Sequence, residues 1–355
     1  MAAPIRVMVV DDSAFMRYTV AKYLEADPGI TVVGSARDGL EALEKIPALR
    51  PDVVTLDVEM PRLDGLATLK RIMAECPLPV VMLSSLTQRG ARTTVQALMR
   101  GAVDFVAKPA VSGDTPAVME QLIAKVKIAA NGCAVARHTP APQLDVVNDE
   151  MYVAPDKPGP RPFHIGDPVI VIGSSTGGPR ALNRVLTDLP GDLVAAVVVV
   201  QHMPAGFTRS LAQRLNETCA ITVQEAAAGD RLARSLVLLA PGDFHMRLEG
   251  RNQVALDKGP RRHHVRPAVD VAMESAVKCH GPKVLGVVLT GMGSDGTEGC
   301  RRIKEAGGRV VVEDESTSVV FGMPRSVVEA GLADYVLPLT EVGAFVAKMV
   351  ANGYP

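Results

Sequence analysis

Residues 168–179 read PVIVIGSSTGGP, and this stretch decides the fold of the second half of the chain. A short apolar run breaks into a turn of glycines and serines, and Pro179 stands where a helix would begin. The pattern predicts a strand, a tight turn and a helix. It fits G-x-S-x-G, in which small neighbours let the turn present the hydroxyl of Ser175. Because unpaired N–H groups at the start of the helix would face the same point, we expect a nucleophile and an anion-stabilising site together.

Two other apolar runs deliver polar residues at their carboxyl ends. Ala195–Val200 has the composition of a strand buried on both faces of a parallel sheet, and His202 follows it closely. Val284–Leu289 is a second such run, and Asp295 lies in the glycine-rich segment after it. In open α/β sheets, ligand chemistry gathers outside the carboxyl ends of the strands. We therefore expect Ser175, His202 and Asp295 to converge.

These three residue types form a nucleophile, a base and an orienting acid. A serine hydroxyl needs a base to activate it, and a carboxylate can fix the tautomer of that base. Taken singly, each has a plainer interpretation: GSSTGG as an anion-binding turn, His202 as a hydrogen-bonded strand-end histidine, and Asp295 as a turn former. Their expected convergence favours catalysis. The order Ser, His, Asp differs from the Ser, Asp, His order of α/β-hydrolases, which argues against that fold.

The amino-terminal part carries an independent set of polar strand ends. Ile5–Val10 is an apolar run that ends in Asp11 and Asp12, and Val53–Leu56 ends in Asp57. Carboxylates gathered at one sheet edge repel one another and need a cation. Oxygen ligands of this kind suit Mg²⁺. The pattern predicts a metal site.

Two further strands would complete this edge. Val80–Leu83 ends in Ser84, and Val103–Ala107 ends in Lys108. A hydroxyl and an ammonium opposite the carboxylates can hold a phosphoryl group that one of them carries. Any one of these residues also fits an ordinary surface position. Four strand ends with complementary chemistry favour a phosphoacceptor site.

At this level of detail the chain resembles two known families. Residues from about 5 to 129 are similar to response-regulator receiver domains, through the acidic pair at 11–12, the segment TLDVEMPRLDG, Ser84 and the Lys-Pro pair at 108–109. Residues from about 168 onward resemble the catalytic domain of the chemotaxis protein-glutamate methylesterases, the CheB family. The matching segments are GSSTGG, QHMPAGFTRSLAQRLN, APGDFHM, RPAVD, LTGMGSDG and SVVFGMPR. Ala268 in RPAVD stands where we expect the family to prefer serine, which slightly weakens any role given to that loop.

The resemblance implies a role for each matched residue. In the receiver it implies phosphorylation at Asp57, a Mg²⁺ site made by Asp11, Asp12, Asp57 and the main-chain carbonyl of Glu59, and switch residues Ser84, Phe105 and Lys108. In the second domain it implies a catalytic triad of Ser175, His202 and Asp295. It also implies an oxyanion site that the main-chain N–H of Met292 serves and that Thr176 supports. It implies no cofactor in the catalytic domain.

The implied fold is α/β, with two doubly wound parallel-sheet domains. A flavodoxin-like receiver would occupy residues 4–125 and a Rossmann-like methylesterase domain residues 166–355. The stretch between Asn131 and Asp167 concentrates proline, charge and small residues without apolar periodicity, which predicts a linker that we assign to residues 126–165.

The implied function is a phosphorylation-regulated serine hydrolase of chemotaxis adaptation. It would demethylate glutamate methyl esters on methyl-accepting chemotaxis receptors, release methanol, and deamidate receptor glutamines. A chemotaxis histidine kinase would be the phosphodonor.

Composition fits a cytoplasmic protein of this kind. A net charge of −1 gives no general attraction to nucleic acid or to anionic membranes, and 3% aromatic residues without tryptophan offer no platform for stacking bases. Five cysteines without a C-x-x-C pair favour reduced thiols over a disulfide framework. The start of the chain lacks an export signal, and no apolar window reaches membrane-spanning length, so we expect no membrane insertion.

A response regulator whose second domain only binds a nucleotide or a protein partner is the alternative. Against it, GSSTGG lacks the G-K-[ST] ending of a phosphate-binding loop, and such a loop gives no role to His202 or Asp295. The basic run Lys258–His264 predicts a solvated loop, with a substrate-facing role near an acidic receptor helix as the alternative.

Overall fold

The computed structural model describes residues 3–109, 112–136, 157–250 and 252–354. Contacts within the chain divide it into two compact units, residues 1–146 and 147–355. No helix in the described ranges is both long enough and apolar enough to span a bilayer.

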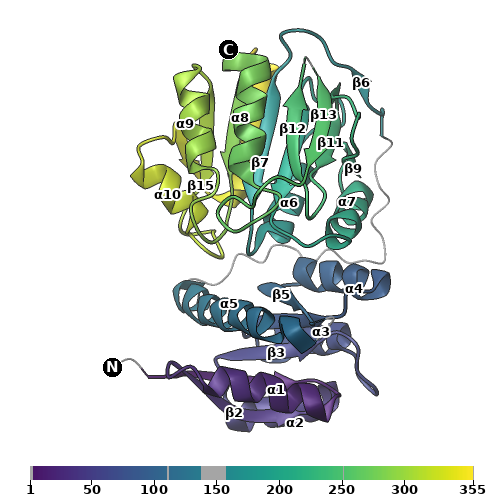
Figure 1. The fold of residues 1–355 in the computed structure, drawn as a ribbon, viewed down its shortest axis with the longest axis vertical. Coiled ribbons are helices and arrows are strands. Elements are labelled where there is room, and N and C mark those ends of the chain that lie inside the picture. Colours follow the sequence, from purple (N-terminus) through teal and green to yellow (C-terminus); the bar gives the residue numbers. More distant parts are fainter. Residues whose placement is uncertain (1–2, 110–111, 137–156, 251, 355) are drawn as a thin grey trace. The chain divides into compact units, whose positions relative to one another are not determined.

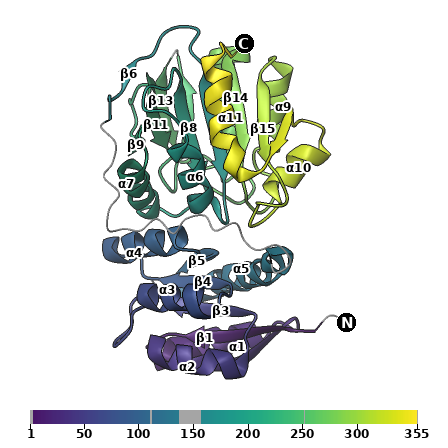
Figure 2. The ribbon, with the colours of Figure 1, turned by 180° about the vertical axis from the view of Figure 1, so that it is seen from behind.

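The first unit is built on a parallel five-stranded sheet with the order β2-β1-β3-β4-β5. Helices α1 and α5 cover one face, and α2, α3 and α4 cover the other (Figures 1 and 2). Its elements are β1 (Ile5–Val10), α1 (Ala14–Glu25), β2 (Ile30–Ala36), α2 (Gly39–Leu49), β3 (Val53–Asp57), α3 (Gly65–Glu75), β4 (Val80–Ser84), α4 (Gln88–Met99), β5 (Asp104–Ala107), the 3₁₀ turn η1 (Ser112–Asp114) and α5 (Thr115–Ala136).

Local sequence explains where these helices begin. The residues before α1, α2, α3 and α4 are extended, and each accepts an N–H from the first turn of its helix: Ser13, Asp38, Asp64 and Thr87. Such caps stabilise a helix by about 1 kcal/mol each. The strands β3 and β4 are buried along their whole length, as expected for a sheet covered on both faces.

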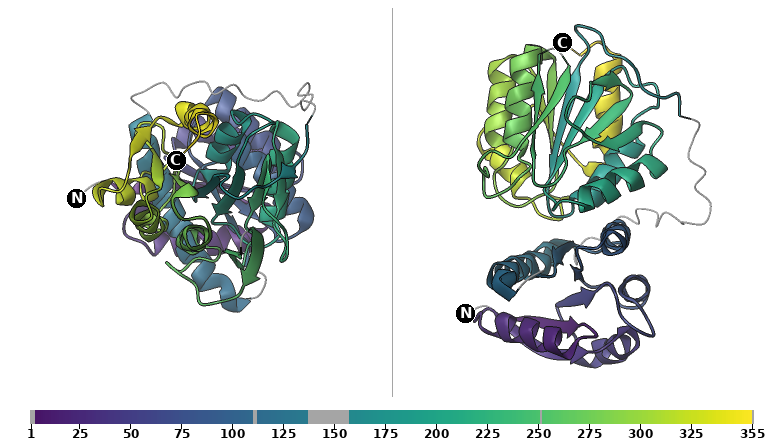
Figure 3. Two further views of the ribbon diagram at one scale, coloured as in Figure 1. Left: turned by 90° about the horizontal axis from the view of Figure 1, so that it is seen from above. Right: turned by 45° about the vertical axis from the view of Figure 1, so that its right-hand side comes forward.

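The second unit contains a parallel seven-stranded sheet with the order β16-β15-β14-β7-β8-β11-β9. Helices α8 and α9 lie on one face, and α6 and α11 lie on the other, so that the sheet is seen between two helical layers (Figure 3, right). The sheet strands are β7 (Val169–Ser174), β8 (Ala196–Gln201), β9 (Thr222–Glu225), β11 (Leu236–Leu239), β14 (Val284–Val288), β15 (Arg309–Glu313) and β16 (Tyr335–Leu337).

The helices of this unit alternate with those strands. They are α6 (Gly178–Thr187), α7 (Phe207–Thr218), α8 (Val269–His280), the 3₁₀ turn η2 (Gly281–Lys283), α9 (Thr297–Glu305), α10 (Met323–Glu329) and α11 (Leu339–Ala351). Two small antiparallel pairs stand outside the main sheet: β6 (Arg161–Pro162) with β10 (Ala233–Arg234), and β12 (His245–Glu249) with β13 (Gln253–Asp257).

The topology places the functional candidates. The chain runs outward from β7 to β8 on one side and later returns to add β14 on the other side of β7. A crevice opens at such a reversal of strand order, at the carboxyl ends of the strands. Ser175, His202 and Asp295 follow these three neighbouring strands.

The predicted fold class, two doubly wound parallel α/β domains, is confirmed. One boundary differs from the prediction: α5 continues to Ala136, whereas we expected the linker to begin at residue 126. The helix continues because Val126 and Ala129 are buried and so belong to the core. Residues 137–156 of the predicted linker lie outside the described residues, and the other domain limits stay predictions.

The loop after β3 yields a test of packing. A Cβ on Gly65 would lie 2.0 Å from the carbonyl oxygen of Asp57 and 2.9 Å from Cα of Val58, and backbone atoms cannot move aside cheaply. We expect Gly65→Ala to lower the free energy of unfolding of the receiver by about 3 kcal/mol, the scale of core overpacking. Gly113→Ala is the control, because apart from the adjoining residues no atom of the described chain lies within 4 Å of a Cβ there. Urea unfolding of the full chain measures both, and equal stability of the two variants would contradict the packing argument.

Candidate active site

Ser175 lies at the turn between β7 and α6. Its N–H donates to the carbonyl of Thr290 at 3.0 Å, and its carbonyl accepts the N–H of Gly178 at 2.8 Å. Gly177, with φ of 79°, caps the helix in the left-handed region that favours glycine. The turn therefore ties the serine to the end of β14 and leaves it partly exposed, as the motif predicted.

His202 and Asp295 are brought together. Nε2 of His202 lies 2.8 Å from Oδ2 of Asp295. Only about a tenth of the His202 side chain is exposed. An ionised carboxylate only accepts hydrogen bonds, so Nε2 carries the proton and Nδ1 is left with a lone pair. In the described chain the Ser175 hydroxyl forms no hydrogen bond to this ring, and such bonds commonly tighten only when substrate binds.

Gln201 connects the serine and histidine segments, a role that sequence reasoning missed. Its Nε2 donates to the carbonyls of Ser175 at 2.9 Å and His202 at 3.2 Å, and its Oε1 accepts the hydroxyl of Ser174 at 2.7 Å. A Cβ on Gly178 would come within 2.0 Å of that Oε1. The buried amide thus fixes β7 and β8 in register at the site, and Ser174 points into this network rather than outward. The sequence signal for Gln201 was its position at the end of a buried strand, directly before His202.

Asp295 is buried and accepts three hydrogen bonds. Besides His202, the N–H groups of Val269 and Asp270 donate to it at 2.7 and 3.0 Å. Burial alone would raise the pKa of Asp295, but the hydrogen bonds and charge of His202 and the two N–H donors outweigh burial and lower the pKa. The carboxylate is therefore ionised at neutral pH and can stabilise an imidazolium.

The two N–H donors begin α8, and this explains the departure at Ala268. Ala268 is the N-cap residue of α8 and has no side chain that could cap it, so the Asp295 carboxylate does this from another loop. Asp270, in the first turn of α8, accepts in turn the N–H groups of Gly296 and Gly299 at the start of α9. Each carboxylate thus caps the other helix.

The segment after β14 contains Met292, the residue expected to support an oxyanion site. A Cβ on Gly291 would lie 2.8 Å from Cβ of Ser175, so this segment passes close beside the serine. Within the described chain the N–H of Met292 donates to no group, and the residue is 54% exposed. The carbonyl of Thr176 accepts the hydroxyl of Thr290 at 3.0 Å. The hydrogen bond of Thr290 thus anchors the segment, while the N–H of Met292 stays available to a ligand.

Glu313 supports the same segment from the end of β15 and was not predicted. Its Oε2 accepts the N–H of Thr290 at 2.7 Å, and its Oε1 is buried without a hydrogen-bond partner in the described residues. Burial raises the pKa of Glu313 to about 7. A buried acid that titrates near neutrality therefore lies behind the Ser175 turn.

The receiver residues converge at the carboxyl ends of β1, β3 and β5. Nζ of Lys108 lies 2.8 Å from Oδ2 of Asp11 and 2.8 Å from Oδ2 of Asp57. Burial raises the pKa of Asp57 to about 6, assisted by the negative charge of Asp11 and opposed by Lys108. The surroundings of the phosphoacceptor candidate therefore disfavour its negative charge.

The carboxylates fit a hard cation. One oxygen from each of Asp11, Asp12 and Asp57 lies within 4.8 Å of the others, and Asp12 is exposed to solvent. Oxygen-only ligands with one side open suit Mg²⁺, which keeps several waters. The N–H of Glu59 approaches Oδ1 of Asp57 at 3.4 Å, which places its backbone at the same site.

The two switch candidates are buried in the described structure. Ser84 donates to the carbonyl of Ser85 at 3.2 Å and accepts the hydroxyl of Thr94 at 2.7 Å. Phe105 is 4% exposed, and Nζ of Lys125 lies 5.4 Å from the centre of its ring. The carbonyl of Ser84 accepts the N–H of Lys108 at 2.7 Å, so a movement at Ser84 would reach the acidic site directly.

The first unit gathers three aspartates beside a lysine, and the second places serine, histidine and aspartate at neighbouring strand ends. Together they define a class: response regulators whose output domain is a hydrolase. Comparison with known proteins identifies the family within that class. A family profile described as CheB methylesterase matches residues 170–346, and one described as response regulator receiver domain matches residues 7–145. The chain belongs to the CheB methylesterase family, which confirms the predicted resemblance.

Relatives match over the full length. A protein of Symbiobacterium thermophilum named protein-glutamate methylesterase/protein-glutamine glutaminase is 51% identical over 99% of this chain and 98% of its own length. A protein of the same name from Thermotoga maritima is 45% identical over 98% of each chain. The crystal structure of the Thermotoga maritima CheB methylesterase catalytic domain is 47% identical and covers 52% of this chain and 98% of its own, with a TM-score of 0.51.

Glu313 gives a test of pH-dependent stability. Because its pKa is raised from 4.5 to about 7 on folding, the folded state binds this proton more tightly than the unfolded state. The contribution to the free energy of unfolding is therefore fully present below about pH 4.5 and is lost as the pH rises to about 7, on the order of 3 kcal/mol in all. We expect Glu313→Gln to stabilise the second unit relative to the native protein at pH 8 and not at pH 4.5.

Urea unfolding of the full chain at the two pH values measures this difference. Glu315→Gln is the matched control, because Glu315 is two residues away and its side chain is 63% exposed. A change for Glu313→Gln that is the same at both pH values would rule out titration of the buried acid.

Proposed function

We propose that this chain is a phosphorylation-regulated protein-glutamate methylesterase, a serine hydrolase that removes methyl groups from glutamate side chains of methyl-accepting chemotaxis receptors. The observation that carries the proposal is the buried His202–Asp295 pair at the ends of strands on both sides of Ser175. The names of the full-length relatives support the substrate class.

Acylation follows from the tautomer of the histidine. With its Nε2 proton directed at Asp295, His202 has a lone pair at Nδ1, which takes the proton of the Ser175 hydroxyl as Oγ attacks the ester carbonyl. The carbon–oxygen bond to the methoxy group then breaks, and methanol leaves with the proton that the imidazolium returns. Asp295 stabilises that imidazolium throughout.

Main-chain N–H groups stabilise the charge that develops on the carbonyl oxygen. The N–H of Met292 is positioned for this role beside Ser175, and the neighbouring turn at Thr176 supports it. Water then attacks the glutamyl ester of Ser175 with His202 again as base, which frees the carboxylate and the serine. The same steps cleave a side-chain amide, so glutamine deamidation is the second activity, with ammonia as the leaving group.

The receiver would control this chemistry through Asp57. When bound, Mg²⁺ held by Asp11, Asp12, Asp57 and the carbonyl of Glu59 would neutralise charge during phosphoryl transfer. Lys108 already contacts Asp57 and would bind the phosphoryl oxygens. Ser84 and Phe105 are the switch residues that would change position in response.

The partners follow from this chemistry. A chemotaxis histidine kinase is the phosphodonor, and methyl-accepting chemotaxis receptors are the substrates. A location in the cytoplasm is part of this proposal.

The central prediction concerns the nucleophile. We expect Ser175→Ala, and equally His202→Ala, to lower kcat on the order of 10⁴-fold, about 5 kcal/mol of transition-state stabilisation, with little change in substrate binding. Methanol release from methylated receptor membranes measures the loss. Ser174→Ala is the control, because that hydroxyl bonds to Gln201 within the fold and should leave most activity in place. Near-normal turnover by Ser175→Ala would exclude a serine esterase.

A separate prediction concerns the switch. We expect a small phosphodonor to label the native chain in a Mg²⁺-dependent reaction and to stimulate methanol release, and we expect Asp57→Asn to abolish both effects. Lys108→Ala should still be phosphorylated but should respond weakly, because the ammonium that reads the new charge is lost. Full labelling of Asp57→Asn would place the acceptor at another residue.

A further inference from the structure

A tight turn at the rim of the active site carries two histidines in an unfavourable conformation. Arg262 and Val265 exchange two backbone hydrogen bonds, of 3.2 and 2.9 Å, around His263 and His264. Both histidines have positive φ, 50° and 63°. Glycine, asparagine and aspartate dominate at such paired left-handed positions, because Cβ of a non-glycine residue there lies close to a backbone carbonyl oxygen. An observed backbone strain of this kind at a site prompts a search for its function.

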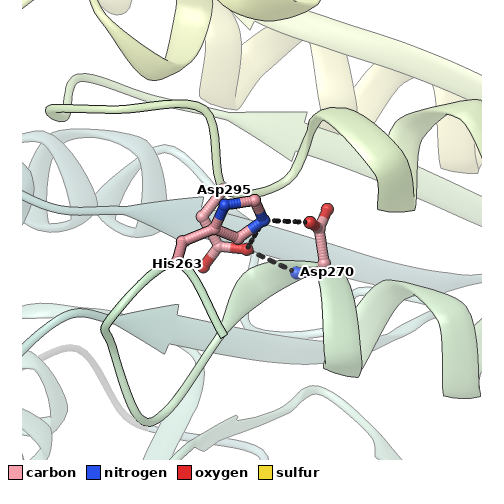
Figure 4. Close-up of side chains that lie close together, drawn as sticks. All are labelled: His263, Asp270 and Asp295. Carbon is pink, nitrogen blue, oxygen red and sulfur yellow. Dashed lines mark hydrogen bonds and ion pairs between the residues drawn. The ribbon is translucent and has the colours of Figure 1, made fainter. Parts of the chain in front are cut away.

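This turn places the His263 ring beside the carboxylates of Asp270 and Asp295. Nε2 of His263 lies 2.8 Å from Oδ2 of Asp270 and 4.0 Å from Oδ1 of Asp295, as Figure 4 shows. The N–H of Asp270 also donates to Asp295. The His263 ring therefore contacts Asp270 directly and is linked to Asp295 through that residue. The side chain of His263 is 38% exposed, so it closes this network on the solvent side.

The hydrogen bond from His263 to Asp270 lies beside a second buried carboxylate, that of Asp295. Asp270 and Asp295 are both buried, with one oxygen of each within 4.8 Å of the other, and like charges at that range repel. Arg262, on the same loop as His263, lies farther from Asp270, with Nε 3.6 Å from Oδ2. Its closer ion pair, at 2.8 Å, is with Glu274 of α8. His202, on the far side of Asp295, is the other imidazole that contacts this pair of carboxylates.

We propose that His263 is a positioning residue of the hydrolase: it holds the Asp270 carboxylate so that Asp295 stays on the ends of α8 and α9 in the orientation that His202 requires. The inference rests on the proposed serine hydrolase function, and it adds a residue outside the triad. His263 acts through Asp270 and touches neither the serine nor the ester.

Removing the ring has two expected consequences. Asp270 loses its closest side-chain donor, so its negative charge is less compensated beside the His202–Asp295 pair. More negative charge near His202 favours its protonated form, in which it cannot act as a base. The acid limb of the pH profile should therefore move to higher pH. Asp295 should also be held less firmly, which lowers kcat rather than substrate affinity.

The turn offers a matched pair of variants. Glycine suits both left-handed positions, so His263→Gly and His264→Gly should each fold and relieve the same backbone strain. Only the first removes a ring that contacts Asp270. His263→Asn is the conservative variant, because asparagine tolerates this backbone conformation and its amide N–H can donate to the carboxylate.

The experiment measures kcat and KM for methanol release by the full chain between pH 5 and 9, together with the rate at which a fluorophosphonate labels Ser175. We expect His263→Gly to lose on the order of tenfold in kcat and in labelling rate, with KM little changed and the acid limb at higher pH. We expect His264→Gly to behave as the native protein and His263→Asn to recover most of the loss.

Equal behaviour of the two glycine variants would overturn the proposal, as would an unshifted acid limb in His263→Gly or a failure of His263→Asn to recover activity. The labelling rate does not depend on the natural substrate. A native protein that is labelled at Ser175 but releases no methanol would therefore refute the methylesterase assignment while the comparison of variants still decides the role of His263.

Discussion

Two buried carboxylates hold the hydrolase site together by capping each other's helices. Asp295 lies just before α9 and accepts the first N–H groups of α8, while Asp270 lies in the first turn of α8 and accepts N–H groups at the start of α9. Each helix end is thereby satisfied by a negative charge, which the positive end of a helix dipole favours. Because α8 and α9 cannot shift independently, the carboxylate that faces His202 is fixed by the fold itself.

The same residue type serves opposite purposes in the two domains because its surroundings differ. Three hydrogen-bond donors outweigh burial at Asp295 and keep its pKa low, whereas at Asp57 burial and the charge of Asp11 prevail over Lys108 and raise the pKa to about 6. An aspartate whose pKa is lowered, and which is therefore ionised at neutral pH, suits the support of an imidazolium. One whose charge is costly suits a position where a cation and a phosphoryl group are to be received.

The sequence contained most of the framework and only part of the site. Apolar runs such as Val284–Val288, followed by glycine and polar residues, predict buried parallel strands and their functional ends, because a strand covered on both faces leaves a continuous hydrophobic trace. The hairpin β12–β13 and the edge strand β16 were not predicted, since short strands without a strong pattern depend on tertiary contacts.

The residues that were missed act through contacts between distant segments. Asp270 contacts Asp295 across 25 positions, and Gln201 contacts Ser175 across 26, so no local pattern reveals either pair. The basic run Lys258–His264 shows how little composition reveals about such contacts. Its composition predicts a solvated loop, yet Arg262 and His263 turn inward to acidic groups of α8.

Both domains place their chemistry where strand order reverses, and this explains how one architecture supports two reactions. In the receiver, Asp11 follows β1 and Asp57 ends the neighbouring strand β3, and in the hydrolase domain the candidate site lies at the ends of β14, β7 and β8. The buried strands supply rigidity, while the short segments beyond them determine the chemistry. Oxygen ligands and an ammonium at one edge favour transfer of a phosphoryl group. A hydroxyl, an imidazole and the N–H of Met292 at the other favour attack on a carbonyl. A few residues at the end of each strand therefore determine which reaction each domain supports.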